Sequence, residues 1–220
     1  HYEVPLWSDR HWKLVEQSLK LLGEAGNAGL VFPLLAESCK GNAESMVYWI
    51  RKADGTWDFD YSLLDRYLAT GLKYHDPKRI KVACLLTYGS QLYLNEDGKK
   101  DLWGAEPKVR DEAAYGAKVT VIDPDSGKKE TVRLPDFGLP EGIAGWKKLL
   151  PAACKRLEDK GLGHATMIGM SEDKAPMPQY LAALREFLPE MVWFRDSHFD
   201  RERLSYDPRD KGKTIPVGCN

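Results

Sequence analysis

Blocks of apolar and charged positions alternate along the chain and predict helices and strands by turns. The helical blocks carry apolar residues at intervals of three and four positions, as Trp12, Val15 and Leu19 do in the first of them. The predicted helices cover residues 9–26, a stretch from about Ser62, about 143–160 and 178–187. Four short apolar runs predict strands that are buried on both faces. The predicted strands cover residues 29–36, 79–89, 164–170 and 190–195.

The order of these elements predicts a parallel sheet with right-handed crossovers. Residues 90–140 interrupt the rhythm, because they are polar and contain two alternating runs, 117–123 and 130–135, joined by Pro-Asp-Ser-Gly-Lys. We predict that these runs form an inserted β-hairpin. Residues 37–60 read as a polar loop, and the tail from Ser197 shows no clear element.

Four strands cannot close an eight-stranded barrel, so the pattern fits either an open sheet or part of a barrel. The leading helix has no strand before it, which favours a piece of a larger barrel, and the absence of an initiator Met agrees with this. We therefore predict an α/β fold over residues 1–220, a single parallel (β/α) domain that forms a partial or half TIM-type barrel with a hairpin insertion at about 90–140. Further segments of the same barrel, or an oligomer, would cover its open strand edges.

Every predicted strand ends in polar residues or is followed by them. They are Glu37-Ser38, Thr87-Tyr88, Ser171-Glu172-Asp173 and Arg195 to His198. In parallel α/β folds the ligand lies at the carboxyl ends of the strands, whether the sheet is open or closed. Four such endings predict one shared site.

Glu172 and Asp173 are the candidate catalytic pair. Two carboxylates can divide acid and base duties when their surroundings separate their pKa values, and glycoside hydrolysis needs such a pair. In substrate-assisted variants the 2-acetamido group of the sugar is the nucleophile, so adjacent carboxylates can orient that group and protonate the leaving oxygen. The alternative is that one carboxylate caps the next helix and the other faces water.

Aromatic and polar side chains near the strand ends suit a carbohydrate, whose C–H faces lie well on aromatic rings. Trp193, within a strand, and Trp12, at helical spacing, are more typical of core residues. The predicted substrate-binding set is Glu37, Trp49, Tyr88, Trp103, Asp196 and His198.

Composition and residue spacing limit the classes of partner and cofactor that we expect for this chain. The 32 basic residues are balanced by 33 acidic ones, and no basic stripe is present, so we predict no nucleic-acid partner. No apolar run approaches the ~18 residues of a membrane span. The four cysteines lie far apart without a C-x-x-C pair, and Cys84 reads as a small buried residue. No metal-ligand spacing or phosphate loop is found, so we predict no metal and no cofactor.

Three stretches carry a family resemblance: "PLWSDRHWKLVEQSLKLLGEAGN", "VFPLL" and "GNAESMVYWIRKADGTWDFDYSLLDRYL". They resemble the catalytic barrel of glycoside hydrolases similar to family 123, a group that includes many bacterial proteins. The resemblance implies a TIM-type barrel, exo-acting release of β-linked N-acetylgalactosamine by substrate assistance, and a secreted, periplasmic or cell-surface location. It also implies a neighbouring Asp-Glu pair at a strand end, often followed by Pro.

Carried over to this chain, the pair is Glu172 and Asp173. Their order is reversed, and Lys174-Ala175 intervene before Pro176. If position decides the roles, Glu172 orients the acetamido group and Asp173 is the acid/base; if residue type decides, the roles reverse. We interpret the chain as a hexosaminidase-type glycosidase. The alternatives are a non-catalytic carbohydrate-binding relative with the same aromatic cleft and an open flavodoxin-like ligand-binding domain.

Overall fold

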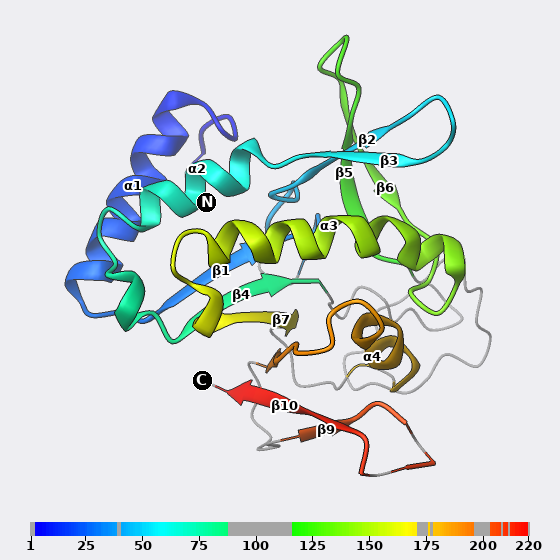
Figure 1. Cartoon of the computed structure of the whole chain (residues 1–220). Helices are drawn as coiled ribbons and strands as arrows, with labels where there is room; N and C mark the ends of the chain where they lie inside the picture. Colours follow the sequence, from blue (N-terminus) through cyan, green and yellow to red (C-terminus); the bar gives the residue numbers. More distant parts are fainter. Residues whose placement is uncertain are drawn as a thin grey trace, which may run out of the picture.

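The computed structural model describes residues 3–38, 41–87, 116–170, 176, 178–195, 203–207, 209–210 and 212–219. Its strands form two sheets, and its helices pack against them (Figure 1). Along the chain the elements are α1 (Asp9–Glu24), β1 (Gly29–Pro33), β2 (Tyr48–Arg51), β3 (Trp57–Asp60), α2 (Ser62–Gly71), η1 (Pro77–Arg79), β4 (Val82–Leu86), β5 (Lys118–Ile122), β6 (Lys129–Arg133), α3 (Pro140–Glu158), η4 (Gly163–Ala165), β7 (Thr166–Met170), α4 (Pro178–Arg185), β8 (Trp193–Arg195), β9 (Arg203–Ser205) and β10 (Thr214–Cys219).

The larger sheet has six strands in the order β1-β4-β7-β8-β10-β9. The first five are parallel, and β9 runs antiparallel to β10. One row of this sheet passes through Pro33, Leu86, Gly169 and Phe194. A Cβ at Gly169 would lie 2.1 Å from the carbonyl oxygen of Phe194, so β7 and β8 approach each other here as only glycine allows. The predicted parallel sheet is thus present, with its four predicted strands in chain order.

All four helices pack on one face of the larger sheet. Side chains of alternate strand positions, such as Phe32 and Leu85, join one large core cluster with residues from α1, α2, α3 and α4. The opposite positions, such as Cys84 and Leu86, form a small separate cluster with Phe194. Figure 1 shows α1 and α2 side by side and α3 lying along the strands. Helices on a single face, over strands in chain order, differ from a flavodoxin-like sheet, which has helices on both faces and a reversal of strand order.

The smaller sheet has the order β3-β2-β5-β6 and corrects the prediction of a loop at residues 37–60. The predicted hairpin is confirmed as β5–β6, and β2–β3 is a second hairpin that pairs with it in parallel at Trp49 and Val121. Residues 52–56 make the turn, where Asp54 accepts from the backbone N–H of Thr56 at 2.9 Å and Gly55 has φ +81°. An Asp-Gly turn between aromatic residues is a hairpin signal that the sequence did carry.

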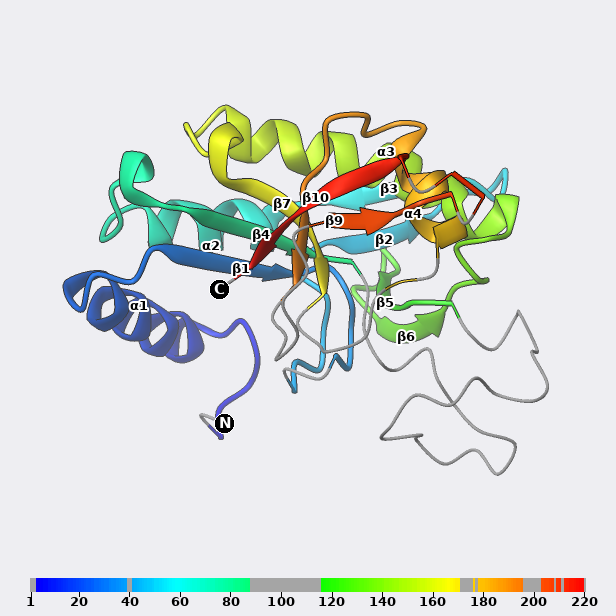
Figure 2. The ribbon, with the colours of Figure 1, turned by 90° about the horizontal axis from the view of Figure 1, so that it is seen from below.

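The tail corrects a second prediction, because β9 and β10 lie in the stretch expected to have no element. Ile215 of β10 is fully buried, and Val217 pairs with Trp193 of β8. Figure 2 shows β10 and β9 next to each other, as the last two strands of the larger sheet. The described part of the chain therefore has a mixed α/β fold with a mostly parallel sheet, and it contains no closed barrel.

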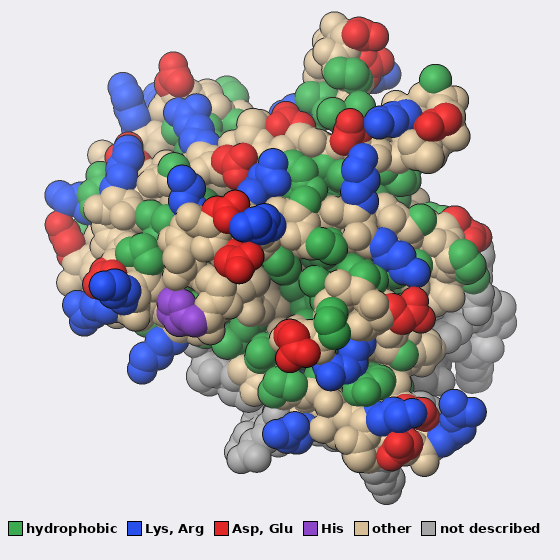
Figure 3. All heavy atoms as spheres, viewed as in Figure 1, with side chains coloured by type: hydrophobic (Ala, Val, Ile, Leu, Met, Phe, Trp, Pro, Cys, Tyr) green, Lys and Arg blue, Asp and Glu red, His purple; other side chains and the backbone are tan. Residues whose placement is uncertain are grey.

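The surface has no region of a single charge on the face drawn in Figure 3, where basic and acidic side chains are interspersed. No helix in the described ranges is long and apolar enough to cross a membrane.

Candidate functional site

The carboxyl ends of the parallel strands form one edge of the larger sheet. The backbone N–H of Thr87 donates to the carbonyl of Gly169 at 3.0 Å, and Met170 pairs with Arg195. Thr87, Met170 and Arg195 therefore end three neighbouring strands at the same level. In the sequence, Glu172 follows Met170 by two positions and Asp173 by three.

Two polar side chains are buried at this edge. Thr87 is fully buried, and its hydroxyl has no hydrogen-bond partner within the described residues. Arg195 is 3% exposed. An arginine keeps its charge when buried and favours carboxylates around it. The edge therefore combines a hydroxyl that can still form a hydrogen bond with a fixed positive charge.

The structure describes two of the eight residues that the sequence proposed for the site, Glu37 and Trp49. The other six lie outside the described residues and are Glu172, Asp173, Tyr88, Trp103, Asp196 and His198.

Glu37 lies on the loop that follows β1. Its backbone is in the left-handed region, with φ +51°, and its N–H donates to the carbonyl of Asn42 at 2.8 Å. Its exposed carboxylate forms an ion pair with Lys118 of β5. The Asn42 amide donates to the carbonyls of Leu35 at 2.6 Å and Glu44 at 3.0 Å, so it ties the two described parts of this loop together.

Trp49 was predicted to bind substrate from a polar loop, and its position corrects this. It lies in β2, is fully buried and belongs to the large core cluster. Its ring makes edge-to-face contacts with Trp57, Phe59 and Trp146 at 5.3, 4.9 and 5.2 Å between centroids. Trp49 therefore stabilises the core, and no face of its ring is open to a sugar. Trp12 and Trp193, predicted to be core residues, are confirmed as buried.

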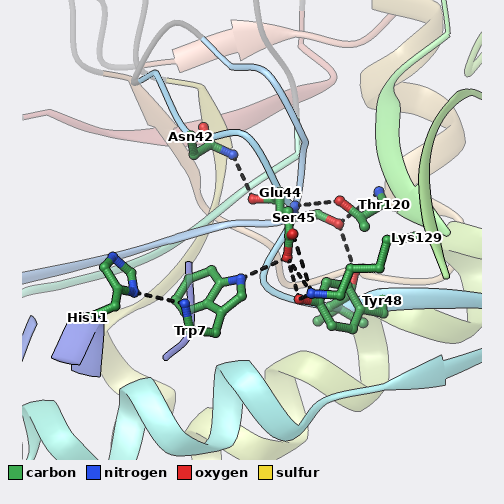
Figure 4. A network of polar contacts seen from close by, with 9 residues as sticks. Trp7, His11, Asn42, Glu44, Ser45, Tyr48, Thr120 and Lys129 are labelled. Carbon is green, nitrogen blue, oxygen red and sulfur yellow. Dashed lines mark hydrogen bonds and ion pairs between the residues drawn. The ribbon is translucent and has the colours of Figure 1, made fainter. Parts of the chain in front are cut away.

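A polar network that the sequence analysis missed lies beside the loop after β1 (Figure 4). At its centre, Glu44 Oε2 accepts hydrogen bonds from Trp7 Nε1 at 2.8 Å and from the hydroxyl of Tyr48. Lys129 of β6 lies 3.0 Å from the same oxygen, 2.6 Å from the Tyr48 hydroxyl, and 4.5 Å from the centre of the Tyr48 ring. The network therefore connects the segment before α1 with β2 and β6.

The network shifts the pKa values of its members. Burial would raise the pKa of Glu44, but hydrogen bonds from Tyr48, Lys129 and Trp7 outweigh it and hold that pKa below its ordinary value. Burial, and then the hydrogen bond to Glu44, raises the pKa of Tyr48. Glu44 is therefore an anion at neutral pH, and Tyr48 keeps its proton.

A cavity of about 660 Å³ lies next to the network, lined by residues 3–7, His11 and residues 41–44. Trp7 and Glu44 are both in its wall. The non-glycine residues with positive φ in the described chain are Glu3, Trp7 and Glu37, and they lie in the two segments that form or adjoin this cavity. Strained backbone gathers at ligand sites more often than elsewhere. The sequence signal for Trp7 was a tryptophan directly before the helix cap Ser8, outside any helical periodicity.

No group of three or more His, Cys, Asp or Glu side chains among the described residues could hold a metal ion. The prediction that no metal or cofactor is used remains a prediction.

Residues 1–195 match the family model described as "Glycoside hydrolase 123, catalytic domain". No curated protein matches the chain.

A similar solved structure is that of a family 123 glycoside hydrolase from Clostridium perfringens, from a study of glycolipid glycan hydrolysis. The TM-score is 0.58 at 18% identity, and the alignment covers 88% of this chain and 32% of that protein. The likeness shows a shared fold, and this chain spans about a third of the length of that structure.

Proposed function

Because the chain belongs to the glycoside hydrolase 123 family, we propose that it forms part of a glycosidase that releases a 2-acetamido hexose by substrate-assisted catalysis. The observation that carries the proposal is the register at the carboxyl ends of the strands. Glu172 and Asp173 follow the last residue of β7 by two and three positions in the sequence, and that residue, Met170, pairs with the buried Arg195. In parallel α/β enzymes this is the edge that holds the catalytic groups.

The proposed fold of the whole catalytic unit is a TIM-type barrel, of which residues 1–220 supply a part. Strands in chain order with helices on one face support this, because each (β/α) unit of a barrel adds a strand beside the last. β1 is at the edge of the sheet, and an uncovered edge favours pairing with another strand. We propose that further barrel segments, or a second copy, cover it.

The two carboxylates have different roles in the proposed reaction. One orients the 2-acetamido group as its oxygen attacks the anomeric carbon, and the other protonates the leaving oxygen. We propose that the carboxylate that orients the acetamido group is ionised and that the other is the protonated acid, because the two roles need different pKa values. We further propose that the sugar is contacted by the remaining predicted residues, which are Glu37, Tyr88, Trp103, Asp196 and His198.

The test is hydrolysis of a chromogenic 2-acetamido glycoside by the protein and its variants. Glu172→Gln and Asp173→Asn are each expected to lower the rate by ~10²-fold or more, because each removes an acid/base or orienting group. Glu130→Gln and Asp125→Asn, which change exposed carboxylates away from this edge, are the matched controls.

Two results would count against the proposal. Full hydrolysis rates in both Glu172→Gln and Asp173→Asn would refute the assignment of the catalytic pair. Equal turnover of glycosides with and without the acetamido group would refute substrate assistance. Affinity for the sugar without any turnover in the parent protein would favour the non-catalytic binding relative, for which the reversed Glu-Asp order is the supporting feature.

A further inference from the structure

We propose that the cavity between residues 3–7 and 41–44 binds the sugar residue next to the one that is released, with Trp7 as its aromatic platform. The inference rests on the proposed function, because it assigns a second sugar position to the same glycosidase. The cavity volume of about 660 Å³ falls within the ~300–1,000 Å³ of small-ligand sites.

The two walls of the cavity differ in polarity in the way that a sugar requires. One wall is the apolar segment Val4 to Trp7, in which Leu6 remains 42% exposed. The other carries Asn42 and Glu44, and His11 lies at the start of α1. A sugar ring presents C–H groups on its faces and hydroxyls at its edge, so it fits between an aromatic wall and a polar one.

Trp7 is held in one orientation before any ligand binds. Its indole N–H donates to Glu44 at 2.8 Å, and its backbone N–H donates to His11 Nδ1 at 3.1 Å. Its ring also contacts His11 and Trp12, at 5.2 and 5.4 Å between centroids. An aromatic ring fixed in this way loses little conformational entropy when a sugar stacks on it. Glu44 is therefore a positioning residue for Trp7.

His11 is in this wall, and its contact with Trp7 fixes the tautomer of its ring. Because Nδ1 accepts the backbone N–H of Trp7, the proton of the neutral ring is on Nε2. Burial lowers the pKa of His11, which favours that neutral form at pH 7.

The charges around the cavity define the class of sugar. Among the described lining residues, Glu3 and Glu44 are acidic and none is Lys or Arg. A carboxylate or sulfate on the sugar would meet these acidic groups. The cavity therefore favours a neutral sugar over a sialylated, uronic or sulfated one.

The cavity adjoins the proposed catalytic edge. Its wall at residues 41–44 belongs to the loop that leaves the carboxyl end of β1, and Glu172-Asp173 leave the carboxyl end of β7. Only β4 separates these two strands, so their ends are about 10 Å apart at the usual spacing of strands. One oligosaccharide can span such a distance.

The test compares two substrates: a disaccharide of the 2-acetamido sugar linked to a neutral hexose, and the methyl glycoside of the same 2-acetamido sugar. Trp7→Ala is expected to lower the ratio of kcat/KM for the disaccharide to that for the methyl glycoside by ~10-fold. Leu6→Glu is expected to lower the same ratio, and Trp7→Phe should keep part of it. Leu21→Ala, which removes an exposed apolar side chain on α1, is the control.

The outcomes separate this inference from the proposed function. If Trp7→Ala is unfolded by circular dichroism, Leu6→Glu decides. An unchanged ratio in folded variants overturns the cavity assignment. If the parent hydrolyses neither substrate, the proposed function fails, and calorimetric titration with the disaccharide still tests the cavity: binding lost in Leu6→Glu supports it, and no binding by the parent refutes it. Stronger binding of a sulfated disaccharide would also refute it.

Discussion

Replacement of Glu44 tests the network that holds Trp7. Glu44→Ala removes the acceptor for two side-chain hydrogen bonds and the partner of Lys129, and it leaves the hydroxyl proton of Tyr48, a residue that is 4% exposed, without its acceptor. Each hydrogen bond to a charged group contributes about 1.5 kcal/mol or more, so we expect a loss of about 3 kcal/mol in the free energy of unfolding. Glu44→Gln keeps an acceptor oxygen and should lose about 1 kcal/mol.

The charge of Glu44 gives this prediction a pH dependence. The folded state holds the pKa of Glu44 below its unfolded value, so the contribution of its charge is complete above the unfolded pKa and is lost as pH falls through the folded one. The difference in stability between the parent protein and Glu44→Gln should therefore be constant from pH 7 to 5 and shrink below about pH 4.3. Other carboxylates with lowered pKa, such as Asp54 and Asp123, are present in both proteins and cancel in the difference.

The assay is urea unfolding at pH 7, 5, 4 and 3, followed by circular dichroism, with Glu130→Gln as the control for an exposed carboxylate on β6. The control should stay within about 0.5 kcal/mol of the parent. A difference between parent and Glu44→Gln that does not change with pH, or a loss in Glu44→Gln as large as in Glu44→Ala, would refute the network as described.

Two further predictions concern the core. A Cβ at Gly145 of α3 would lie 2.2 Å from the Trp49 ring, so Gly145→Ala should lower the free energy of unfolding by about 2 kcal/mol or more, measured by thermal unfolding. Gly29→Ala is the control and should lower it less, because the new Cβ meets only ordinary contacts. Equal losses in the two variants would contradict the packing of Trp49. Burial raises the pKa of the Cys84 thiol and raises the pKa of Cys154 to about 11, so neither thiol should react with iodoacetamide at pH 8 in the native protein. Peptide mapping should find both cysteines unlabelled in the native protein and labelled in urea. Labelling of Cys84 in the native protein would contradict its burial.

The sequence predicts the central sheet well because its strands are buried on both faces. Runs such as residues 82–86 are apolar at every position, so they do not show the alternation of apolar and polar faces that marks a surface helix. The helices between them have a clear helical periodicity. β2 and β3 were missed because each has four residues and β3 carries two aspartates. The parallel pairing of Trp49 with Val121 joins residues 72 positions apart, and no local pattern records such a contact.

The same limit applies to the candidate site. An aromatic residue in a polar stretch fits a ligand platform or a core residue equally well until its neighbours are known. Trp49 is buried because the loop assigned to it is a strand under α3. Trp7 faces a cavity because Glu44, 37 residues away, holds its indole. β9 and β10 were missed because β9 has three residues and β10 contains Pro216. The pairing of β10 with both β8 and β9 compensates for these weak local signals.

The inserted hairpin β5–β6 has a structural task that its sequence does not suggest. The loop after β1 contacts it at four places: Ala36 N–H donates to the carbonyl of Lys118 at 2.8 Å, Glu37 pairs with the Lys118 side chain, Glu44 pairs with Lys129, and Ser45 exchanges two hydrogen bonds with Thr120 at 2.9 and 3.0 Å. Ser45 and Thr120 are buried, so solvent does not compete with their bonds. The same loop supplies one wall of the cavity and lies at the carboxyl end of β1. The hairpin therefore holds the described part of the loop on which the proposed sugar position depends. Substitution of Lys118, Thr120 or Lys129, which make these contacts, should alter sugar recognition although the hairpin supplies no residue to the cavity wall.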